Sequence, residues 1–465
     1  MSSRVCVIGA GPSGSVFAAR MAQLDHEVCL IERAVFPRDR VGESLSPGVL
    51  PLLEMIGARE AVERAGFRRV TRISTTWEGE LDERDADPLS LLVDRGRFDM
   101  LLRERARALG VRVLQPASIV ERRRDGDRWV LRVDAAGESV ELEADFLADA
   151  GGRAGALPGR RTASAARTFA LYAYWRGSSL PDQPRIEAGA DAWYWGVPLP
   201  DGRYNTLVFV DVARIRDERA GSIDDLFRQL IGASGLMTGC DDAQIDGDVH
   251  AVDATPYLDE ECVTASSIKI GDAALAIDPL SSSGVQKAIQ SALSGAIVAN
   301  TQLRRPESAE AARRFYRESL QQTSARHEGW AAEHYASVAS RRGGTFWEDR
   351  AAGATSPVRE STRASAAPDS RPSATSLVGL SPLVEFVDLP CIDGDFVTVK
   401  TAVRHPELDA PLAYLGGWEL APLLNDVTPG MTPLDVVRTW SDRVPPKSGT
   451  AIAGWLLDHR ILVTR

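Results

Sequence analysis

Short apolar runs alternate with helix-compatible segments at the start of the chain. Val5 to Ile8 is an apolar run with β-branched residues, Ser15 to Gln23 is small and compatible with a helix, and Val28 to Ile31 is a second apolar run. Runs of this length beside glycine turns are typical of buried strands. The pattern predicts a strand–helix–strand unit. A helix ending at Gly110 and a strand from Val111 follow.

The pattern changes to long alternating strands after about residue 166. The segments TFALYAYWRG and RYNTLVFVDV alternate their residue types, which is typical of an antiparallel sheet. Strand, loop and helix return near residue 262, and residues 307–350 have a helical pattern. We expect an α/β fold with a three-layer, Rossmann-like module over residues 1–350, made of nucleotide-binding parts at about 1–165 and 262–350 and a substrate-lobe sheet at about 166–261.

Composition shifts after this module. The segment AAGATSPVRESTRASAAPDSRPSATS is rich in Ala, Ser, Pro and Arg and has almost no large apolar residue, so residues 351–379 are predicted to be a flexible linker. Residues 380–465 contain two strands and then helix-period apolar stripes. Thr432 and Pro433 have the residue types of a helix N-cap and first position. We expect a small α+β domain with the outline of a winged helix.

Charge and composition exclude several classes of protein. The 465 residues are 44% hydrophobic and carry a net charge of -11, which argues against a general nucleic-acid binder. No apolar run is long enough for a membrane span, and the N-terminal residues lack the apolar core of a signal peptide, so we expect a cytoplasmic protein. The five cysteines are scattered without a Cys-x-x-Cys pair, and we predict no metal site.

A glycine motif follows the first predicted strand. Gly9-Ala10-Gly11-Pro12-Ser13-Gly14 fits Gly-x-Gly-x-x-Gly, opens the predicted helix, and is followed by Glu32 at the end of the next strand. This context is the dinucleotide-binding fingerprint, in which the helix N-terminus receives a pyrophosphate and the acidic residue binds ribose hydroxyls. The fingerprint alone does not separate FAD from NAD. Its expected cofactor contacts are Gly9, Gly11, Pro12, Ser13, Gly14, Glu32, Arg33 and Arg40.

Three later segments resemble FAD-dependent monooxygenases. VDRGRFDMLLRERARALGV resembles the segment in which an arginine, here Arg97 or Arg95, contacts the FAD. DFLADAGGRAG resembles the turn that closes over the adenosine half. In IKIGDAALAIDPLSSSGVQKAIQSALSGA the likeness implies that Asp272 binds the ribityl chain and that a helix N-terminus meets the flavin ring. The cofactor residues implied in this last segment are Asp272, Pro279, Ser283, Gly284 and Val285.

Three motifs resemble the flavin-dependent halogenases and their monooxygenase and geranylgeranyl-reductase-like relatives. The stretch VGESLSPG resembles the loop that crosses the flavin, which places Gly42, Glu43 and Ser44 near the ring. AWYWGVP fits the Trp-x-Trp-x-x-Pro of halogenases, and SSSGV resembles the segment near which halide binds. No catalytic base can be named from these motifs. The pocket candidates are Trp193, Trp195, Pro279, Ser282 and His250.

The halogenase resemblance fails at one position. Phenolic halogenases carry a lysine in a Gly-Phe-x-x-Lys segment, and the matching GFRRVTRISTTWEG has Val70 there and contains no lysine. Valine cannot capture hypohalous acid, and the nearby arginines are poor replacements. The resemblance without this lysine implies oxygen activation as a flavin C4a-hydroperoxide and hydroxylation of an electron-rich aromatic.

The expected function is FAD-dependent monooxygenation, with tryptophan in a peptide or protein precursor as the expected substrate. This type resembles the flavoprotein monooxygenases of tryptophylquinone cofactor biogenesis. NAD(P)H, or reduced flavin from a partner reductase, would supply electrons. The alternatives are hydroxylation of a small or carrier-bound aromatic, halogenation, prenyl-chain reduction, and a non-enzymatic flavin-holding scaffold that binds a partner.

Overall fold

The chain divides into two compact units in a computed structural model. The structure describes residues 2–216, 221–240, 242–352 and 376–464. The first unit comprises residues 1–309 and 316–358, and the second comprises residues 310–315 and 359–465. Most of the predicted linker, residues 353–375, lies outside the described part. No helix in the described part has the length and apolar character needed to cross a membrane.

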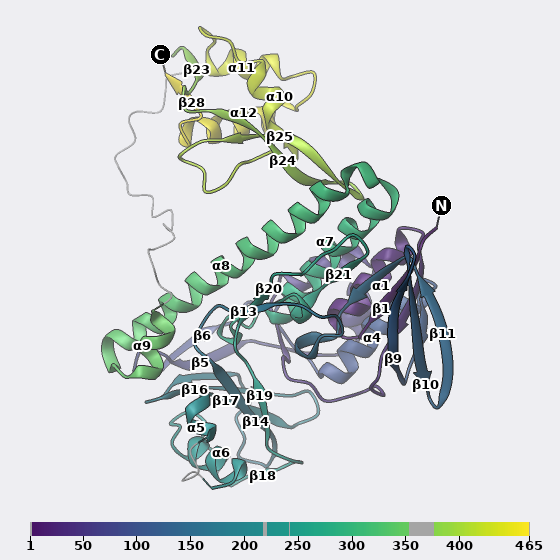
Figure 1. Ribbon diagram of the computed structural model, residues 1–465. Coiled ribbons are helices and arrows are strands. Elements are labelled where there is room, and N and C mark those ends of the chain that lie inside the picture. Colours follow the sequence, from purple (N-terminus) through teal and green to yellow (C-terminus); the bar gives the residue numbers. More distant parts are fainter. Residues whose placement is uncertain (1, 217–220, 241, 353–375, 465) are drawn as a thin grey trace. The chain divides into compact units, whose positions relative to one another are not determined.

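A parallel sheet forms the centre of the first unit (Figure 1). Its strand order is β21-β12-β1-β2-β8, and every neighbouring pair is parallel. The predicted strand–helix–strand unit is confirmed, with α1 (Pro12–Gln23) between the first two strands in sequence. The strands are β1 (Arg4–Ile8), β2 (Glu27–Ile31), β8 (Arg112–Leu114), β12 (Phe146–Asp149) and β21 (Ser267–Lys269).

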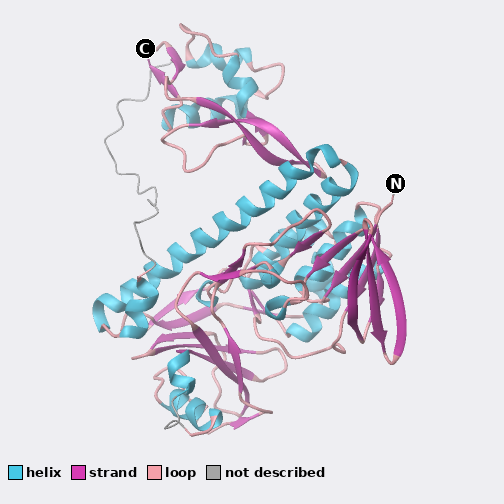
Figure 2. Ribbon diagram, viewed as in Figure 1, coloured by secondary structure: helices cyan, strands magenta, loops and turns pink. Residues whose placement is uncertain are grey.

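Helices and a second sheet accompany this parallel sheet (Figure 2). Helix α1 packs against α4 (Arg95–Ala108) and against α7 (Gly284–Arg304). The antiparallel strands β9 (Ala117–Asp125), β10 (Arg128–Ala135) and β11 (Glu138–Ala144) form a separate sheet. Leu131 and Val133 of that sheet share one apolar cluster with Cys6, Ile31 and Leu147 of the parallel sheet.

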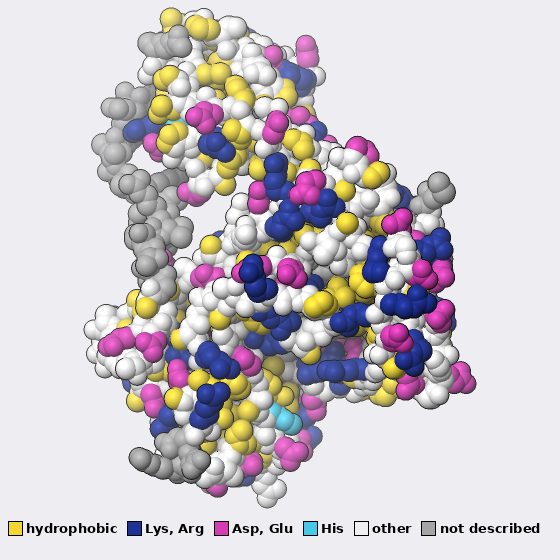
Figure 3. Space-filling view, in the orientation of Figure 1, with side chains coloured by type: hydrophobic (Ala, Val, Ile, Leu, Met, Phe, Trp, Pro, Cys, Tyr) yellow, Lys and Arg dark blue, Asp and Glu magenta, His cyan; other side chains and the backbone are white. Residues whose placement is uncertain are grey.

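The outer surface of the β9–β11 sheet is charged without a single-sign patch. On the face shown in Figure 3, Lys and Arg side chains lie among Asp and Glu over this sheet. Arg132 pairs with Glu121 at 2.9 Å, and Arg128 pairs with Glu143 at 3.2 Å. These exposed pairs neutralise one another locally, unlike the basic stripe that a nucleic-acid-binding surface requires.

The segment predicted as the substrate lobe belongs to an eight-stranded sheet in the order β18-β14-β17-β16-β15-β5-β6, with β19 also paired to β14. The predicted antiparallel pairing within about 166–261 is confirmed for the strands of this sheet. The sheet also takes in β5 and β6 from outside that range, and β15 pairs with β5 in parallel. Strand β5 comes from an earlier segment, so no hairpin joins it to β15. The strands are β5 (Arg72–Thr76), β6 (Asp82–Asp85), β14 (Thr168–Arg176), β15 (Arg185–Ala188), β16 (Ala192–Pro198), β17 (Tyr204–Asp211), β18 (Gln244–Ile245) and β19 (His250–Asp253).

The two faces of this sheet have different partners. Tyr194, Tyr204 and Val208 pack with Phe227 of α6 (Ile223–Gly232) on one face. Trp193, Leu207 and Phe209 belong to a different cluster, which includes residues of α8 and α9. This second cluster also contains Leu280, so this face of the sheet lies beside the segment that is predicted to bind the flavin.

The remaining elements complete the first unit. The predicted helical pattern over residues 307–350 is confirmed as α8 (Ala309–Arg342) and α9 (Thr345–Ala351). The remaining elements are α2 (Val49–Met55), α3 (Arg59–Arg64), α5 (Val212–Arg216), β3 (Ser44–Leu45), β4 (Arg68–Arg69), β7 (Leu91–Leu92), β13 (Arg161–Ala163), β20 (Tyr257–Asp259) and β22 (Leu275–Ala276).

The second unit has its own apolar core. Trp440 is fully buried in it and donates from Nε1 to the Leu423 carbonyl oxygen at 2.8 Å. Thr432 caps a helix that begins at Pro433, as predicted. The elements are β23 (Val378–Leu380), β24 (Glu385–Asp393), β25 (Phe396–Arg404), β26 (Tyr414–Leu415), β27 (Trp418–Glu419), α10 (Leu420–Asn425), α11 (Pro433–Thr439), α12 (Pro446–Asp458) and β28 (Leu462–Thr464).

Asp149 holds the turn after β12 and provides a test of the fold. Its buried carboxylate accepts backbone N–H groups from Gly151 at 2.8 Å, Ala156 at 2.6 Å and Leu157 at 2.7 Å. Asp149→Asn places an amide against these donors, so we expect a loss of about 3 kcal/mol in unfolding free energy. Chemical unfolding of the full chain measures this loss of unfolding free energy. Asp145→Asn, which disturbs one such bond, is the control and should cost less than half as much; equal losses would contradict the assignment.

Candidate active site

The first glycine turn packs against the end of β12. A Cβ on Gly9 would lie 2.5 Å from the Ala150 carbonyl oxygen, and a Cβ on Gly14 would lie 1.8 Å from the Gly9 carbonyl oxygen. Neither position can carry a side chain. The space beside Gly11 is open, since the nearest atom to a Cβ there is Arg38 Nη2 at 3.8 Å. Helix α1 starts here with no side-chain cap, so its N-terminus is available to an anion.

Glu32 lies at the end of β2, beside this turn. Its buried carboxylate accepts the Ala10 N–H on Oε2 and the Ala34 N–H on Oε1, each at 2.8 Å. A carboxylate oxygen has more than one lone-pair site, so each oxygen can still accept a ribose hydroxyl. The position agrees with the fingerprint.

A second uncapped helix N-terminus lies at α7. Asp278 caps the short 3-10 helix Pro279–Ser281 by accepting the Leu280 N–H at 2.9 Å, and Ser282 then has a left-handed φ of 49°. Helix α7 begins at Gly284, where a Cβ would meet nothing within 4 Å. The 21-residue helix therefore presents its positive end to open space.

Asp272 is joined to a buried lysine. Lys287 in the first turns of α7 donates from Nζ to Asp272 Oδ1 at 3.1 Å and to the Leu275 carbonyl oxygen. Burial lowers the pKa of Lys287, and the Asp272 carboxylate opposes that shift. Asp272 remains 42% exposed at its side chain, so it can bind Lys287 and still offer an oxygen to a ligand.

The loop of residues 41–48, which is predicted to cross the flavin, is held at both ends by hydrogen bonds. Ser44 and Leu45 form β3, which pairs with β7. The Val41 carbonyl oxygen accepts from Arg95, whose guanidinium also binds both carboxylate oxygens of buried Asp99. Farther along the loop, Ser46 Oγ donates to the Gln286 side-chain oxygen on α7 at 2.5 Å. The loop therefore lies against the N-terminal end of α7.

Glu43 joins this loop to the substrate sheet. Its Oε1 accepts Asn205 Nδ2–H at 2.8 Å and the Tyr174 hydroxyl at 3.2 Å, and its Oε2 accepts the Gly42 N–H at 2.8 Å. Burial raises the pKa of the Glu43 carboxyl above its ordinary value, while backbone hydrogen bonds and the bond from Asn205 oppose the rise. A buried carboxyl therefore bridges two parts of the first unit.

The sheet face next to Glu43 is aromatic. Trp193 stacks on Phe209 with ring centroids 3.7 Å apart and is 2% exposed. Trp77 meets Trp193 edge-on at 6.2 Å and Trp347 of α9 at 5.6 Å. We call this surface the aromatic face; its members are Tyr172, Tyr174, Trp193, Trp195, Leu207 and Phe209.

Val70 packs beside the aromatic face. It is 3% exposed and packs in a cluster with Leu92, Tyr174 and Val197, against which Trp195 is also packed. Lysine occurs in the sequence at positions 269, 287, 400 and 447 only. In the first unit, Lys269 is buried in an ion pair with Asp259 at 2.7 Å, and Lys287 is held by Asp272.

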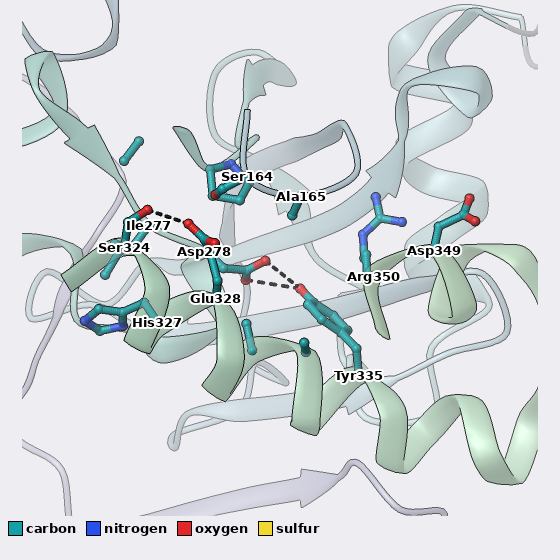
Figure 4. Close-up of a pocket in the computed structure, with 14 residues that line it drawn as sticks. Ser164, Ala165, Ile277, Asp278, Ser324, His327, Glu328, Tyr335, Asp349 and Arg350 are labelled. Atoms are coloured by element: carbon teal, nitrogen blue, oxygen red, sulfur yellow. Dashed lines mark hydrogen bonds between the residues drawn. The ribbon is translucent and has the colours of Figure 1, made fainter. Parts of the chain in front are cut away.

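A cavity of about 70 Å³ is lined by Asp278, by residues of α8 that include Tyr335, and by Arg350 of α9. Tyr335 donates to both Asp278 carboxylate oxygens at 3.1 Å, and the two side chains point toward one another in Figure 4. Burial raises the pKa of Asp278, and the Leu280 N–H and Tyr335 hydroxyl oppose that shift. This volume holds a few water molecules and does not accommodate a flavin ring.

Several predicted residues have side chains that are exposed to solvent. Arg97 is exposed above the Phe67 ring at 5.6 Å, whereas Arg95 is the arginine beneath the loop. His250 is exposed, with its ring 5.0 Å from that of Tyr172. Arg33 and Arg40 are also exposed.

The sequence interpretation missed three residues of this site. Asn205 interrupts an apolar strand, and Lys287 interrupts a largely small and apolar helix face. A polar residue within such an apolar pattern is the sequence signal that could have identified both. Arg38 lies between Gly11 and Asp99, with its guanidinium 3.7 Å from Asp99, and no pattern in the loop distinguishes it from its neighbours.

These residues fit bound FAD. A pyrophosphate and a flavin ring edge need room and free N–H groups, which the uncapped helix N-termini beside Gly11 and Gly284 offer. The two polyol segments need acidic partners, which Glu32 and Asp272 offer. The protein therefore has the features of an FAD-binding site. It belongs to the tryptophan halogenase family, whose sequence model matches residues 4–83 and 69–371.

Individual relatives have different reactions. The tryptophan 2-halogenase of Chondromyces crocatus is 32% identical over 312 residues, which cover 63% of this chain and 60% of that enzyme. The structure of the peptidyl tryptophan dihydroxylase QhpG, essential for tryptophylquinone cofactor biogenesis, has a TM-score of 0.76 and 28% identity over 99% of both chains. The flavin-dependent halogenase CmlS shares the fold, with a TM-score of 0.78 and 22% identity over 100% of this chain and 96% of its own.

The role assigned to Asp272 can be measured by FAD titration. Asp272→Ala removes a charge-assisted hydrogen bond to the ribityl chain, so we expect FAD binding to weaken by about 1.5–3 kcal/mol. The change also leaves the charge of Lys287 buried without its carboxylate. The double variant Asp272→Ala/Lys287→Met removes that charge as a control, and it should bind FAD as weakly as Asp272→Ala does. Wild-type affinity in either variant would contradict the placement.

The burial of Glu43 predicts a pH-dependent stability difference. The raised pKa means that the folded protein keeps this proton after the unfolded chain has lost it, so Glu43 reduces stability as pH rises from about 4.3 toward the folded pKa. Glu43→Gln lacks this effect. The unfolding free energy of the variant should therefore rise relative to that of wild type as the pH increases above about 4.3, by up to about 1.4 kcal/mol per pH unit, until the folded carboxyl also ionises. Parallel curves at a fixed FAD concentration would show that Glu43 titrates normally.

Proposed function

We propose that this enzyme hydroxylates the indole ring of a tryptophan held in a peptide or protein. The observation that carries the proposal is Val70, a buried apolar residue at the position where the resemblance places the halogenase lysine. Without an amine on the aromatic face, the site has no group to hold an oxidised halogen. An oxygen atom therefore goes directly to the substrate.

The aromatic face suits an electron-rich ring. Buried tryptophan, tyrosine and phenylalanine side chains favour stacked or edge-on contact with another aromatic ring, and here they surround the sheet positions next to the Glu43 loop. Their burial also excludes water, which protects the reacting oxygen species from wasteful breakdown. The chain's part in the reaction is to bind and orient the ring in a dry site.

FAD, when bound and reduced, supplies two electrons for the reduction of dioxygen. One oxygen atom is inserted into a ring C–H bond to give C–OH, and the other takes up the two electrons and two protons and leaves as water. NAD(P)H, or reduced flavin from a separate reductase, is the proposed source of electrons. The proposed peptide substrate is supported by the likeness to QhpG over 99% of both chains, whereas the match to the Chondromyces halogenase covers 63% of this chain.

The test is a product analysis under labelled oxygen. The purified holoenzyme is supplied with NADH, a flavin reductase, ¹⁸O₂, and excess chloride and bromide, with N-acetyl-tryptophanamide and a panel of tryptophan-containing peptides as probes. We expect products that gain ¹⁸O and no halogen, and no product when oxygen is omitted.

Three results would contradict the proposal. A halogenated product would show that the missing lysine is replaced by another group. Turnover without oxygen would indicate a reductase. The absence of product from every tryptophan probe would remove tryptophan as the substrate.

A further inference from the structure

The Asn205 carboxamide has one polar atom with a hydrogen-bond partner and one without. Its Nδ2 donates to Glu43 Oε1 at 2.8 Å. Its Oδ1 is buried and has no hydrogen-bond partner among the residues that the structure describes, and the residue is 0% exposed. Leaving a buried acceptor unsatisfied is costly, so this oxygen calls for an N–H or O–H donor from a ligand.

The orientation of Asn205 follows from the alternation of β17. Leu207 and Phe209, two and four residues farther along, belong to the cluster that contains Trp193, whereas Tyr204 and Val208 belong to the cluster on the opposite face. Asn205 therefore lies on the aromatic face, as its bond to Glu43 requires. Its backbone is paired with Val197 on one side and Tyr174 on the other, so the carboxamide is held on a central strand.

We propose that Asn205 Oδ1 accepts the hydrogen bond of the substrate's indole N–H. This inference rests on the proposed function and adds a specificity determinant to it. An apolar aromatic surface recognises the ring but does not distinguish indole from other aromatic groups. A fixed acceptor within that surface selects a ring that carries an N–H donor.

Glu43 strengthens the proposed contact. The bond from Asn205 Nδ2 to the Glu43 carboxyl polarises the amide, which makes Oδ1 a better acceptor. Oxygen attack draws electrons from the indole, so its N–H becomes a stronger donor as the transition state forms, with the proton remaining on nitrogen throughout. The contact therefore gains strength in the transition state and should affect kcat as well as binding.

The test pairs a change in the enzyme with a change in the probe. The probes are N-acetyl-tryptophanamide and its benzothiophene analogue, in which sulfur replaces the N–H. The variant is Asn205→Leu, and Tyr174→Phe is the matched control because it removes the other donor to Glu43 Oε1 and leaves Asn205 in place. The kcat/KM ratio for the two probes is measured for each enzyme, together with probe affinity for the oxidised holoenzyme.

We expect the tryptophan-to-analogue ratio to fall at least tenfold in Asn205→Leu relative to wild type, and to stay near the wild-type value in Tyr174→Phe. Comparing ratios cancels the different reactivity of the two rings. Wild-type affinity should also favour the indole probe, a result that does not depend on the folding of any variant.

The inference is overturned if the ratio is unchanged in Asn205→Leu, or if the variant loses FAD affinity while its ratio stays at the wild-type value, since the acceptor would then serve the flavin. Equal wild-type affinity for both probes would also overturn it. These outcomes are separate from a failure of the proposed function, in which wild type would oxygenate neither probe.

Discussion

The hydrogen bonds of the Glu43 carboxyl connect the two halves of the site. The loop that carries Glu43 is fixed on one side by β3 and by Arg95, and on the other by Ser46 against α7. From there Glu43 reaches across to Asn205 and Tyr174 on the substrate sheet. Such a bridge sets the distance between the flavin-binding segments and the aromatic face, because a buried carboxyl that lost these partners would carry a large desolvation penalty.

The site combines a halogenase framework with different local chemistry. The glycine turn, Asp272 and the α7 N-terminus are the parts that we expect to hold and polarise a flavin, and the family match covers all of them. We propose that the difference lies where the oxidant meets the substrate. Val70 fills that region with apolar volume, and both lysines of the first unit are already held in ion pairs. The same framework can therefore support oxygen transfer without a halide carrier.

Local constraints explain which features could be predicted from the sequence. Gly9 and Gly14 follow from close backbone approach, Glu32 from its spacing after the glycines, and the Thr432 cap from its neighbour Pro433; each depends on a few adjacent residues. The bond between Glu43 and Asn205 joins residues 162 positions apart, and single-sequence patterns contain no information about such a pairing. The parallel pairing of β5 with β15 was missed for the same reason.

The position of the flavin ring can be measured in crystals of the FAD-loaded protein. We expect isoalloxazine density between the Glu43 loop, the N-terminal end of α7 and the aromatic face, with Asn205 on the substrate side of the ring. Ring density elsewhere, such as against Asp278 and Tyr335 in the cavity behind the loop, would contradict this expectation.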